Sequence, residues 1–169
     1  MSGATLLASG RMSDADFSQV TRNAPLVSFD VIVRNRENKV LVMLRNDEPA
    51  KASYFVPGGR ISKNEPLEVA FERVLLRETG QPLKFAAAQF RGVYQHFYAA
   101  NRFSNPEFGT HYVVLAYDIA IEHDGAIDLD ETHSSYRWLS EAELLASPDV
   151  HEYVKDYFRA ERRHNHAPL

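Results

Sequence analysis

The chain contains no cysteine, which excludes disulfide bonds, thiolate catalysis and cysteine-bound zinc. It also has no apolar run approaching the roughly 20 residues that cross a bilayer, so we expect no membrane contact. The N-terminus lacks a charged segment followed by a long apolar one. We therefore expect no secretory signal and a cytoplasmic location.

A large excess of one charge sign is missing as well. The 19 basic and 23 acidic residues are interspersed, the net charge is −4, and no basic stripe indicates nucleic-acid binding. A phosphate-bearing substrate would therefore need local arginines and a metal ion. With 169 residues, 44% of them hydrophobic, the chain suits one domain, expected at 13–163 behind an N-terminal extension at 1–12.

Hydrophobic periodicity predicts the elements of this domain. Helices are expected at 13–23, 65–79, 141–146 and 149–163, and strands at 26–33, 40–44, 85–98, 111–121 and 135–139. Strands before and after one buried helix, with helices at the end, indicate an α/β (α+β) fold. Its mixed sheet would carry helices on two faces.

The segment between the second and third strands holds the most informative pattern. A turn, Pro57-Gly58-Gly59, leads into the helix at 65–79, for which Asn64 is a reasonable N-cap and Gly80 a left-handed C-cap. Glycines allow left-handed or tight backbone and close approach to a ligand. Alone, the glycine pair would be an ordinary turn; with this helix following, it indicates a functional loop.

This pattern resembles the Nudix hydrolase signature, G-x5-E-x7-R-E-U-x-E-E-x-G-U, where U is aliphatic. With Gly59 as the first glycine, the matching positions are Glu65, Arg73, Leu75, Glu78 and Gly80. Val74 and Arg77 stand where the signature has glutamate, and Gln81 where it has an aliphatic residue. The resemblance implies the Nudix fold, a mixed β-sheet in an α/β/α sandwich.

The departures match one branch, the GDP-mannose mannosyl hydrolases. The segments similar to that branch are PLVSFDVIV, YFVPGGRI, AFERV, FRGVYQHFY, THYVVLAY, DETHSSYRWL and LLASPDVH, within residues 14–160. The resemblance also implies a homodimer.

One Mg²⁺ per active site is the implied cofactor. The resemblance assigns the carbonyl of Gly58 and the carboxylate of Glu78 as its ligands, in keeping with the preference of Mg²⁺ for hard oxygen donors. Val74, one helical turn before Glu78, cannot add a ligand. The branch has a glutamine ligand where this chain has Thr132, whose hydroxyl or a bound water would have to substitute.

His133 is the implied general base. A loop histidine with an ordinary pKa of roughly 6.5 can accept a proton near pH 7, although most of the seven histidines must be bystanders. Arg45 and Arg60 are either surface arginines or bidentate ligands of phosphate oxygens. The resemblance places both against the diphosphate of the substrate.

Five further residues match branch positions that face the substrate: Phe17, Asp30, Gln95, His96 and Tyr112. Asp30 lies in an apolar strand, where an unpaired carboxylate is costly, so a sugar hydroxyl or an arginine is expected beside it. Tyr112 either donates to a phosphate or packs, and Phe17 either stacks on a purine or belongs to the core. Glu65 and Arg73 are expected to form a structural ion pair rather than to act in catalysis.

The reaction implied is hydrolysis of GDP-mannose, or a related GDP-hexose, to GDP and free sugar by water attack at the anomeric carbon with inversion. Two alternatives stay open. One is a conventional pyrophosphatase that cleaves a P–O bond of a nucleoside diphosphate derivative. The other is a catalytically silent domain that binds a nucleotide sugar.

Overall fold

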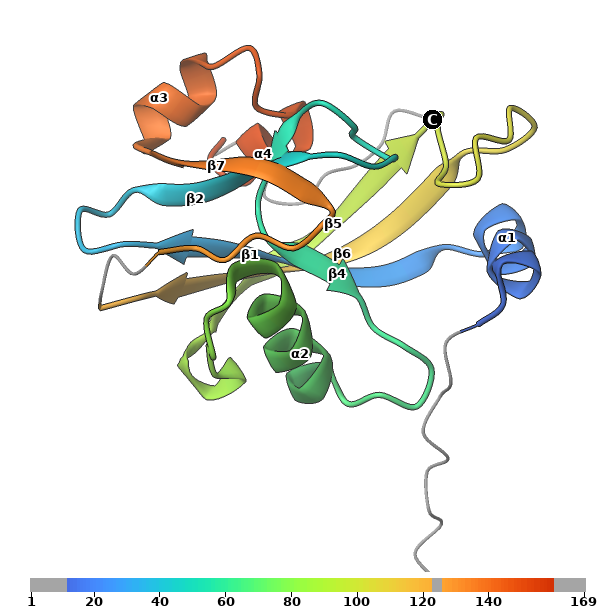
Figure 1. Cartoon of the computed structure of the whole chain (residues 1–169), viewed down its shortest axis with the longest axis horizontal. Helices are drawn as coiled ribbons and strands as arrows, with labels where there is room; N and C mark the ends of the chain where they lie inside the picture. Colours follow the sequence, from blue (N-terminus) through green and yellow to red (C-terminus); the bar gives the residue numbers. More distant parts are fainter. Residues whose placement is uncertain (1–11, 123–125, 160–169) are drawn as a thin grey trace, which may run out of the picture.

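Strand β1 (Leu26–Arg34) lies at the centre of the sheet in the computed structural model, which describes residues 12–122 and 126–159 (Figure 1). It pairs in parallel with β6 (Thr110–Ala120) and antiparallel with β2 (Val40–Arg45) and β4 (Gly58–Arg60). The main strand order is β3-β2-β1-β6-β5, with β7 against β2. The remaining elements are α1 (Asp14–Asn23), β3 (Tyr54–Phe55), α2 (Leu67–Thr79), the 3₁₀ helix η1 (Phe85–Ala87), β5 (Gln89–Tyr98), β7 (His133–Leu139), α3 (Glu141–Ala146) and α4 (Glu152–Asp156).

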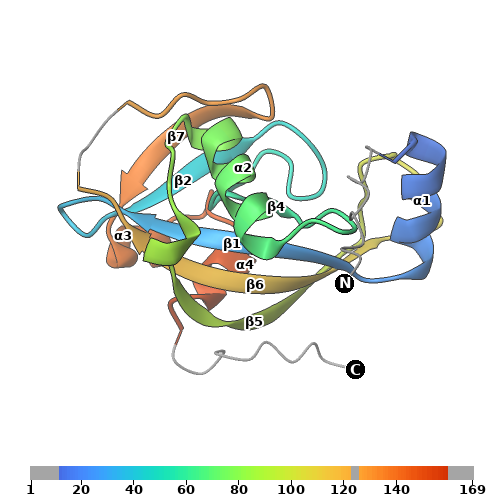
Figure 2. The same ribbon diagram turned by 90° about the horizontal axis from the view of Figure 1, so that it is seen from below.

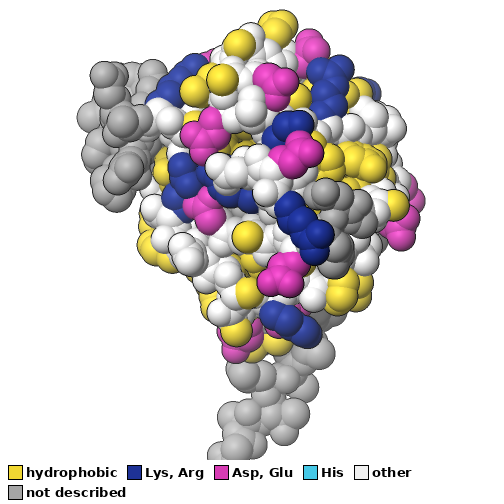
Figure 3. Space-filling model, turned by 90° about the vertical axis from the view of Figure 1, so that its left-hand side faces the viewer, with side chains coloured by type: hydrophobic (Ala, Val, Ile, Leu, Met, Phe, Trp, Pro, Cys, Tyr) yellow, Lys and Arg dark blue, Asp and Glu magenta, His cyan; other side chains and the backbone are white. Residues whose placement is uncertain are grey.

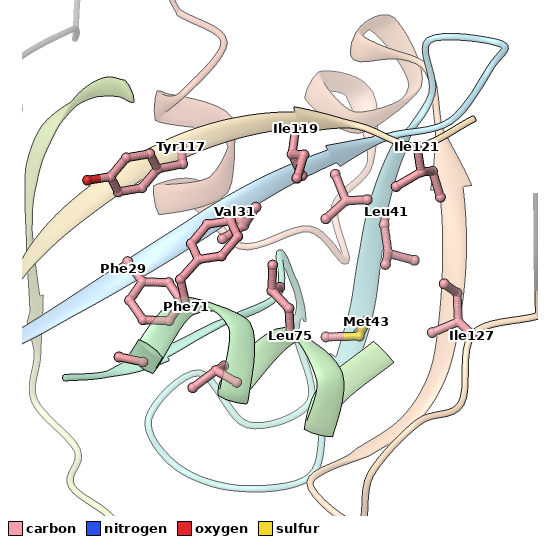
Figure 4. Close-up of a cluster of buried hydrophobic side chains, with 13 residues drawn as sticks. Phe29, Val31, Leu41, Met43, Phe71, Leu75, Tyr117, Ile119, Ile121 and Ile127 are labelled. Carbon is pink, nitrogen blue, oxygen red and sulfur yellow. The ribbon is translucent and has the colours of Figure 1, made fainter. Parts of the chain in front are cut away.

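Two apolar layers cover the two faces of this mixed sheet. On one face, α2 buries Phe71 and Leu75 against Phe29 and Met43 of the strands (Figure 4). On the other, α3 and α4 lie over the sheet (Figure 1). They bury Leu144 and other apolar side chains. Seen from below, α2 lies in front of the sheet and α1 lies beside it (Figure 2). The predicted α/β/α sandwich is confirmed.

The ends of α2 show which capping predictions hold. Gly80 is the left-handed C-cap, with φ 68°. The predicted N-terminus is wrong: the helix starts at Leu67 with Pro66 as its N-cap, and Asn64 takes a left-handed conformation with φ 64°. The carboxylate of Glu65 accepts instead from the Ser62 amide, which holds this residue in the preceding loop.

Three other predicted boundaries differ. The expected strand at 85–98 starts at Gln89, because Phe85 turns into a 3₁₀ helix and packs on Phe71 and Tyr117. The strand expected at 135–139 begins already at His133. The last helix ends at Asp156 within the described residues, and the predicted domain end at 163 lies outside them.

The Gly58-Gly59 segment is extended and forms β4, whereas the sequence predicted a turn. Neither glycine has a positive φ. Gly58 is required for close approach instead: a Cβ there would lie 2.5 Å from both the Asp30 Oδ1 and the Phe29 carbonyl oxygen. β4 thus lies directly against the residues of β1 that border the candidate site.

The surface agrees with the mixed charge of the sequence. On the face drawn in Figure 3, basic and acidic side chains alternate without a continuous basic stripe. None of the helices in the described part of the chain is long and apolar enough to span a membrane.

Candidate active site

Helix α2 and strand β4 meet at Glu78. The Gly58 amide donates to Glu78 Oε2 at 3.0 Å, so the two predicted metal-binding residues are in direct contact. The Glu78 side chain is 6% exposed. Burial raises the pKa of this carboxyl, while the neighbouring His133, the Gly58 amide and Arg77 partly offset the shift.

A second cluster forms where the loop after residue 126 enters β7. His133 Nδ1 lies 2.9 Å from Asp130 Oδ1, and the His133 side chain is 3% exposed. Because a carboxylate only accepts hydrogen bonds, Nδ1 carries a proton, and in the neutral form of the ring the lone pair is on Nε2. Thr132 Oγ1 also donates to Asp130 Oδ1, at 2.6 Å. Hydrogen bonds from Thr132 and His133 lower the pKa of Asp130 despite the opposing effect of burial.

Arg77 joins these two clusters. Its Nη2 donates to Glu78 Oε1 at 2.9 Å, and its Nε lies 3.3 Å from Asp130 Oδ2. In the sequence, this residue was marked only as an arginine in place of a signature glutamate. The structure therefore connects Gly58, Glu78, Arg77, Asp130 and His133 in one continuous chain of contacts.

The donors of this region fit a single Mg²⁺. Glu78, the Gly58 carbonyl and the Thr132 hydroxyl are hard oxygen donors, and Mg²⁺ in proteins commonly binds one or two carboxylates together with water and substrate phosphates. No group of three or more histidine and carboxylate side chains in the described residues could hold a metal ion by itself. Carbonyl, hydroxyl, water or substrate oxygens would therefore complete the coordination that Glu78 begins.

Val74 and the Glu65–Arg73 pair have structural roles. Val74 is 1% exposed, and its methyl groups would lie 3.0 Å from a Cβ at Gly59, so it fills the space beneath β4. Arg73 Nε and Nη2 donate to the two oxygens of Glu65 at 2.6 and 2.8 Å. Arg73 also reaches the Arg60 carbonyl at 3.4 Å, so the pair fixes the loop to the helix as predicted.

Asp30 lies beside Gly58 and contacts Tyr157, which belongs to the apolar layer on the other face of the sheet. It pairs with Gly58 across β1 and β4 and is 7% exposed. Burial raises its pKa to about 7, against a hydrogen bond from Tyr157 and the positive charge of Arg45. The Tyr157 hydroxyl donates to Asp30 Oδ2 at 2.5 Å and lies 3.2 Å from His96 Nε2. Burial lowers the pKa of His96 to about 3, so this histidine is neutral and Nε2 carries the proton donated to Tyr157.

The charges of the two predicted arginines, Arg45 and Arg60, both act on Tyr112. Burial raises the pKa of this phenol, and the charges of Arg60, Arg45 and Arg102 act against the shift. Arg45 pairs with His133 in the β2–β7 register, next to a shift of register that re-aims side chains locally. The Arg45 Nε donates to the Pro49 carbonyl at 2.9 Å, which orients its guanidinium.

Phe17 is 5% exposed and lies under the guanidinium of Arg60, whose Cζ is 3.6 Å from the ring centroid. Phe103 meets the same ring edge-on at 5.5 Å. The packing alternative therefore describes Phe17 in this arrangement, because the ring is nearly buried and the Arg60 guanidinium lies against it. The ring instead supports an arginine at the site.

Gln95 is not brought to the other residues. It pairs with Val113, whereas His96 pairs with Tyr112 one residue along β5. Since side chains alternate across a strand, Gln95 lies on the face opposite Asp30, His96 and Tyr112.

Four residues of the site escaped the sequence interpretation: Arg77, Arg102, Asp130 and Tyr157. The Asp-x-x-His spacing before β7 was the one available signal for Asp130. Arg102 lies in the loop shaped by buried Asn101, whose amide donates to the Asn105 and Phe108 carbonyls. No local pattern relates that loop, or the last helix, to β1.

Comparison with known proteins agrees with this geometry. The NUDIX domain family model matches residues 24–160. A curated relative, "Low-salt glycan biosynthesis protein Agl8" of Haloferax volcanii, is 31% identical over 152 residues, covering 89% of this chain and 90% of the relative. The chain belongs to the Nudix family.

Solved structures share the fold at low sequence identity. The MutT protein from Methanosarcina mazei Go1 superposes with a TM-score of 0.67 at 20% identity, covering 83% of this chain and 94% of the other. The NUDIX domain of Shewanella oneidensis NrtR, solved with ADP ribose, gives 0.59 at 18% identity, covering 89% and 99%. Nudix hydrolases typically use a divalent metal ion, usually Mg²⁺.

Proposed function

We propose that this Nudix hydrolase cleaves GDP-mannose, or a related GDP-hexose, to GDP and the free sugar. Water attacks the anomeric carbon and inverts it. As the new C–O bond forms, His133 Nε2 accepts a proton from the water, and the electron pair of the glycosidic C–O bond leaves on the diphosphate oxygen.

The observation that carries this proposal is the Asp130–His133 pair. The pair fixes the ring and directs the Nδ1 proton to Asp130, so Nε2 is the ring nitrogen left to accept a proton, as a general base requires. The signature helix, in contrast, offers only Glu78 where the signature has three carboxylates near the metal. Because the proposed base, His133, lies outside that helix, we favour attack at the sugar carbon over attack at phosphorus.

The chain's cationic side chains suit the leaving group. The charges of Arg45 and Arg60 both act on the Tyr112 phenol, and a diphosphate bound beside this phenol would be attracted by two planar guanidinium groups. Negative charge that grows on the diphosphate during departure is stabilised by such fixed charges. A divalent ion bound by Glu78, the Gly58 carbonyl and Thr132 would add Lewis-acid stabilisation of the same oxygens.

Asp30 is proposed to meet the sugar. Its carboxyl is buried, shares a short hydrogen bond with Tyr157 and titrates near neutrality, so it can donate to or accept from a hydroxyl group. His96 would hold Tyr157 in place. The description of the Haloferax relative as a glycan biosynthesis protein supports a sugar-bearing substrate. The guanine base rests on the resemblance alone.

The competing activity is P–O cleavage by a conventional pyrophosphatase. Membership of the Nudix family favours it as the second candidate, because the signature positions Glu65, Arg73 and Glu78 are retained. Chromatography of the products after incubation with GDP-mannose and Mg²⁺ separates the two. GDP and mannose are expected, whereas GMP and mannose 1-phosphate would establish the pyrophosphatase, and no turnover would indicate a binding domain.

We also propose a homodimer, on the resemblance. Exposed Phe90, Val93 and Phe97 on the edge strand β5 support an association surface. Light scattering coupled to size exclusion is expected to give twice the 19.2 kDa mass of the chain.

A further inference from the structure

Arg77 departs from the signature and contacts two nearly buried carboxylates. The signature has a glutamate at this position, and this chain has an arginine whose side chain is 52% exposed. Its guanidinium nevertheless contacts two nearly buried carboxylates, Glu78 at 2.9 Å and Asp130 at 3.3 Å. Their side chains are 6% and 11% exposed.

Two carboxylates this close need a cation between them. Like charges in a poorly solvated site repel strongly, and a positive charge that contacts both removes most of that cost. The intact signature has two more glutamates on this helix, and Nudix hydrolases typically use a divalent metal ion. In this chain the cation that contacts both Glu78 and Asp130 is the guanidinium of Arg77, a side chain of the protein itself.

The contact also determines what Glu78 can still bind. One oxygen of Glu78 accepts from Arg77 and the other from the Gly58 amide. A carboxylate has about four acceptor positions, so each oxygen keeps room for one further contact. This capacity suffices for one divalent ion and leaves no free carboxylate for another.

The guanidinium acts on the base through Asp130. Arg77 contacts Asp130 Oδ2, while the other oxygen of Asp130 accepts from His133 Nδ1 and from Thr132. The positive charge of Arg77 attracts the Asp130 carboxylate, and this carboxylate in turn holds the imidazole by accepting from Nδ1.

We propose that Arg77 replaces a second divalent ion at this site. It is a positioning residue: its guanidinium neutralises Glu78 and Asp130 together and, through Asp130, fixes the ring and the tautomer of His133. The second half of this inference rests on the proposed function, since it takes His133 as the base.

The first test counts metal ions without turnover. Mn²⁺ bound per chain is measured by electron paramagnetic resonance at saturating GDP, for the wild type and for Arg77→Glu. We expect one ion in the wild type and two in Arg77→Glu, where three carboxylates would face each other without a cation. A single ion in a folded Arg77→Glu variant would overturn the replacement of a metal ion. This count is independent of which bond the enzyme breaks.

The second test uses milder substitutions and a matched control. Arg77→Ala should lower kcat by roughly 10- to 100-fold, the usual effect of losing a residue that orients a ligand or base, with GDP affinity unchanged within about twofold. Arg77→Lys should recover part of the loss, because an ammonium keeps the charge but not the planar contacts. Lys84→Ala is the control, because it breaks a 2.6 Å ion pair with Glu72, which like Arg77 belongs to α2 but lies outside the site. This variant should keep wild-type kcat. A wild-type kcat in Arg77→Ala would refute the positioning role.

A double-mutant cycle separates positioning from a general structural effect. If Arg77 acts through His133, then Arg77→Ala should cost nothing further in a His133→Gln background. Additive losses would contradict the route through His133. If His133→Gln itself kept full activity, the proposed base would fail, and the Mn²⁺ count would still decide whether Arg77 replaces a metal ion.

Discussion

Asp130→Asn is the substitution whose effect the structure defines most closely. Oδ1 of Asp130 accepts from His133 Nδ1 at 2.9 Å, from Thr132 Oγ1 at 2.6 Å and from the Thr132 amide at 3.1 Å, whereas Oδ2 faces only Arg77. An asparagine would direct its oxygen towards the three donors and its NH₂ towards Arg77, which is half exposed and can swing away. The His133 tautomer would therefore survive, and only the negative charge would be lost.

The magnitude follows from that charge. A carboxylate and a protonated imidazole about 4 Å apart attract each other by about 4 kcal/mol at an effective dielectric constant of 20. Because a tenfold change in rate corresponds to about 1.4 kcal/mol, the upper limit is a loss of roughly 1,000-fold. Release of Arg77 offsets part of this, so kcat for Asp130→Asn should fall roughly 100- to 1,000-fold.

The assay compares kcat with the affinity for GDP measured by calorimetry. GDP affinity should stay within about twofold. Asp130 contacts His133, the proposed general base, and not Arg45 or Arg60, the proposed ligands of the diphosphate. Asp130→Ala also removes the orientation of the ring and should approach the loss of the base itself, up to roughly 10,000-fold. A kcat for Asp130→Asn within about threefold of the wild type would refute the account of His133 as a base activated by Asp130.

Three other predictions concern the base, the metal and the loop. His133→Gln should lower kcat roughly 100- to 10,000-fold and keep GDP binding, and near-normal turnover would remove His133 from the mechanism. Glu78→Gln should shift the Mg²⁺ titration of activity to much higher concentration, and an unchanged titration would place the metal elsewhere. The hydrogen bond from Arg73 lowers the pKa of Glu65 below its ordinary value of 4.5, so the pair stabilises the fold above that pH and loses its effect as pH falls through the lower, folded value. Urea unfolding should accordingly show Glu65→Gln less stable than the wild type by up to about 1 kcal/mol at pH 7, with the difference shrinking in acid; a difference that grows in acid would contradict the assignment.

The sequence predicted the features that depend on local patterns. The apolar spacing from Leu67 to Leu75 places α2 on the sheet, and Gly80 ends that helix in the left-handed conformation, as glycine does at low cost. The bidentate contact of Glu65 with Arg73 follows from fixed positions in the signature. These features involve residues close in the chain, or a face of one helix.

Predictions that depended on tertiary register were less successful. Gln95 and His96 are neighbours in sequence and belong to opposite faces, so a motif that includes both cannot describe one site. Gly58 is needed because β4 lies against β1, a pairing that no local pattern shows. Tyr157 reaches Asp30 across 127 positions of the chain.

Arg77 shows a different limit of the sequence. Counted against the signature, it is a lost carboxylate. In the structure, the same residue is a cation between Glu78 and Asp130, because the loop before β7 brings Asp130 to the helix. The substitution changes the sign of the charge at the site, which a comparison of matched positions does not reveal.

Hydrolysis in oxygen-18 water is the most direct test of attack at the sugar carbon. Mass spectrometry of the products should find the label in the free hexose and none in GDP, and proton NMR at early times should show the inverted anomer. Label in a phosphate group would place the attack on phosphorus and contradict the account.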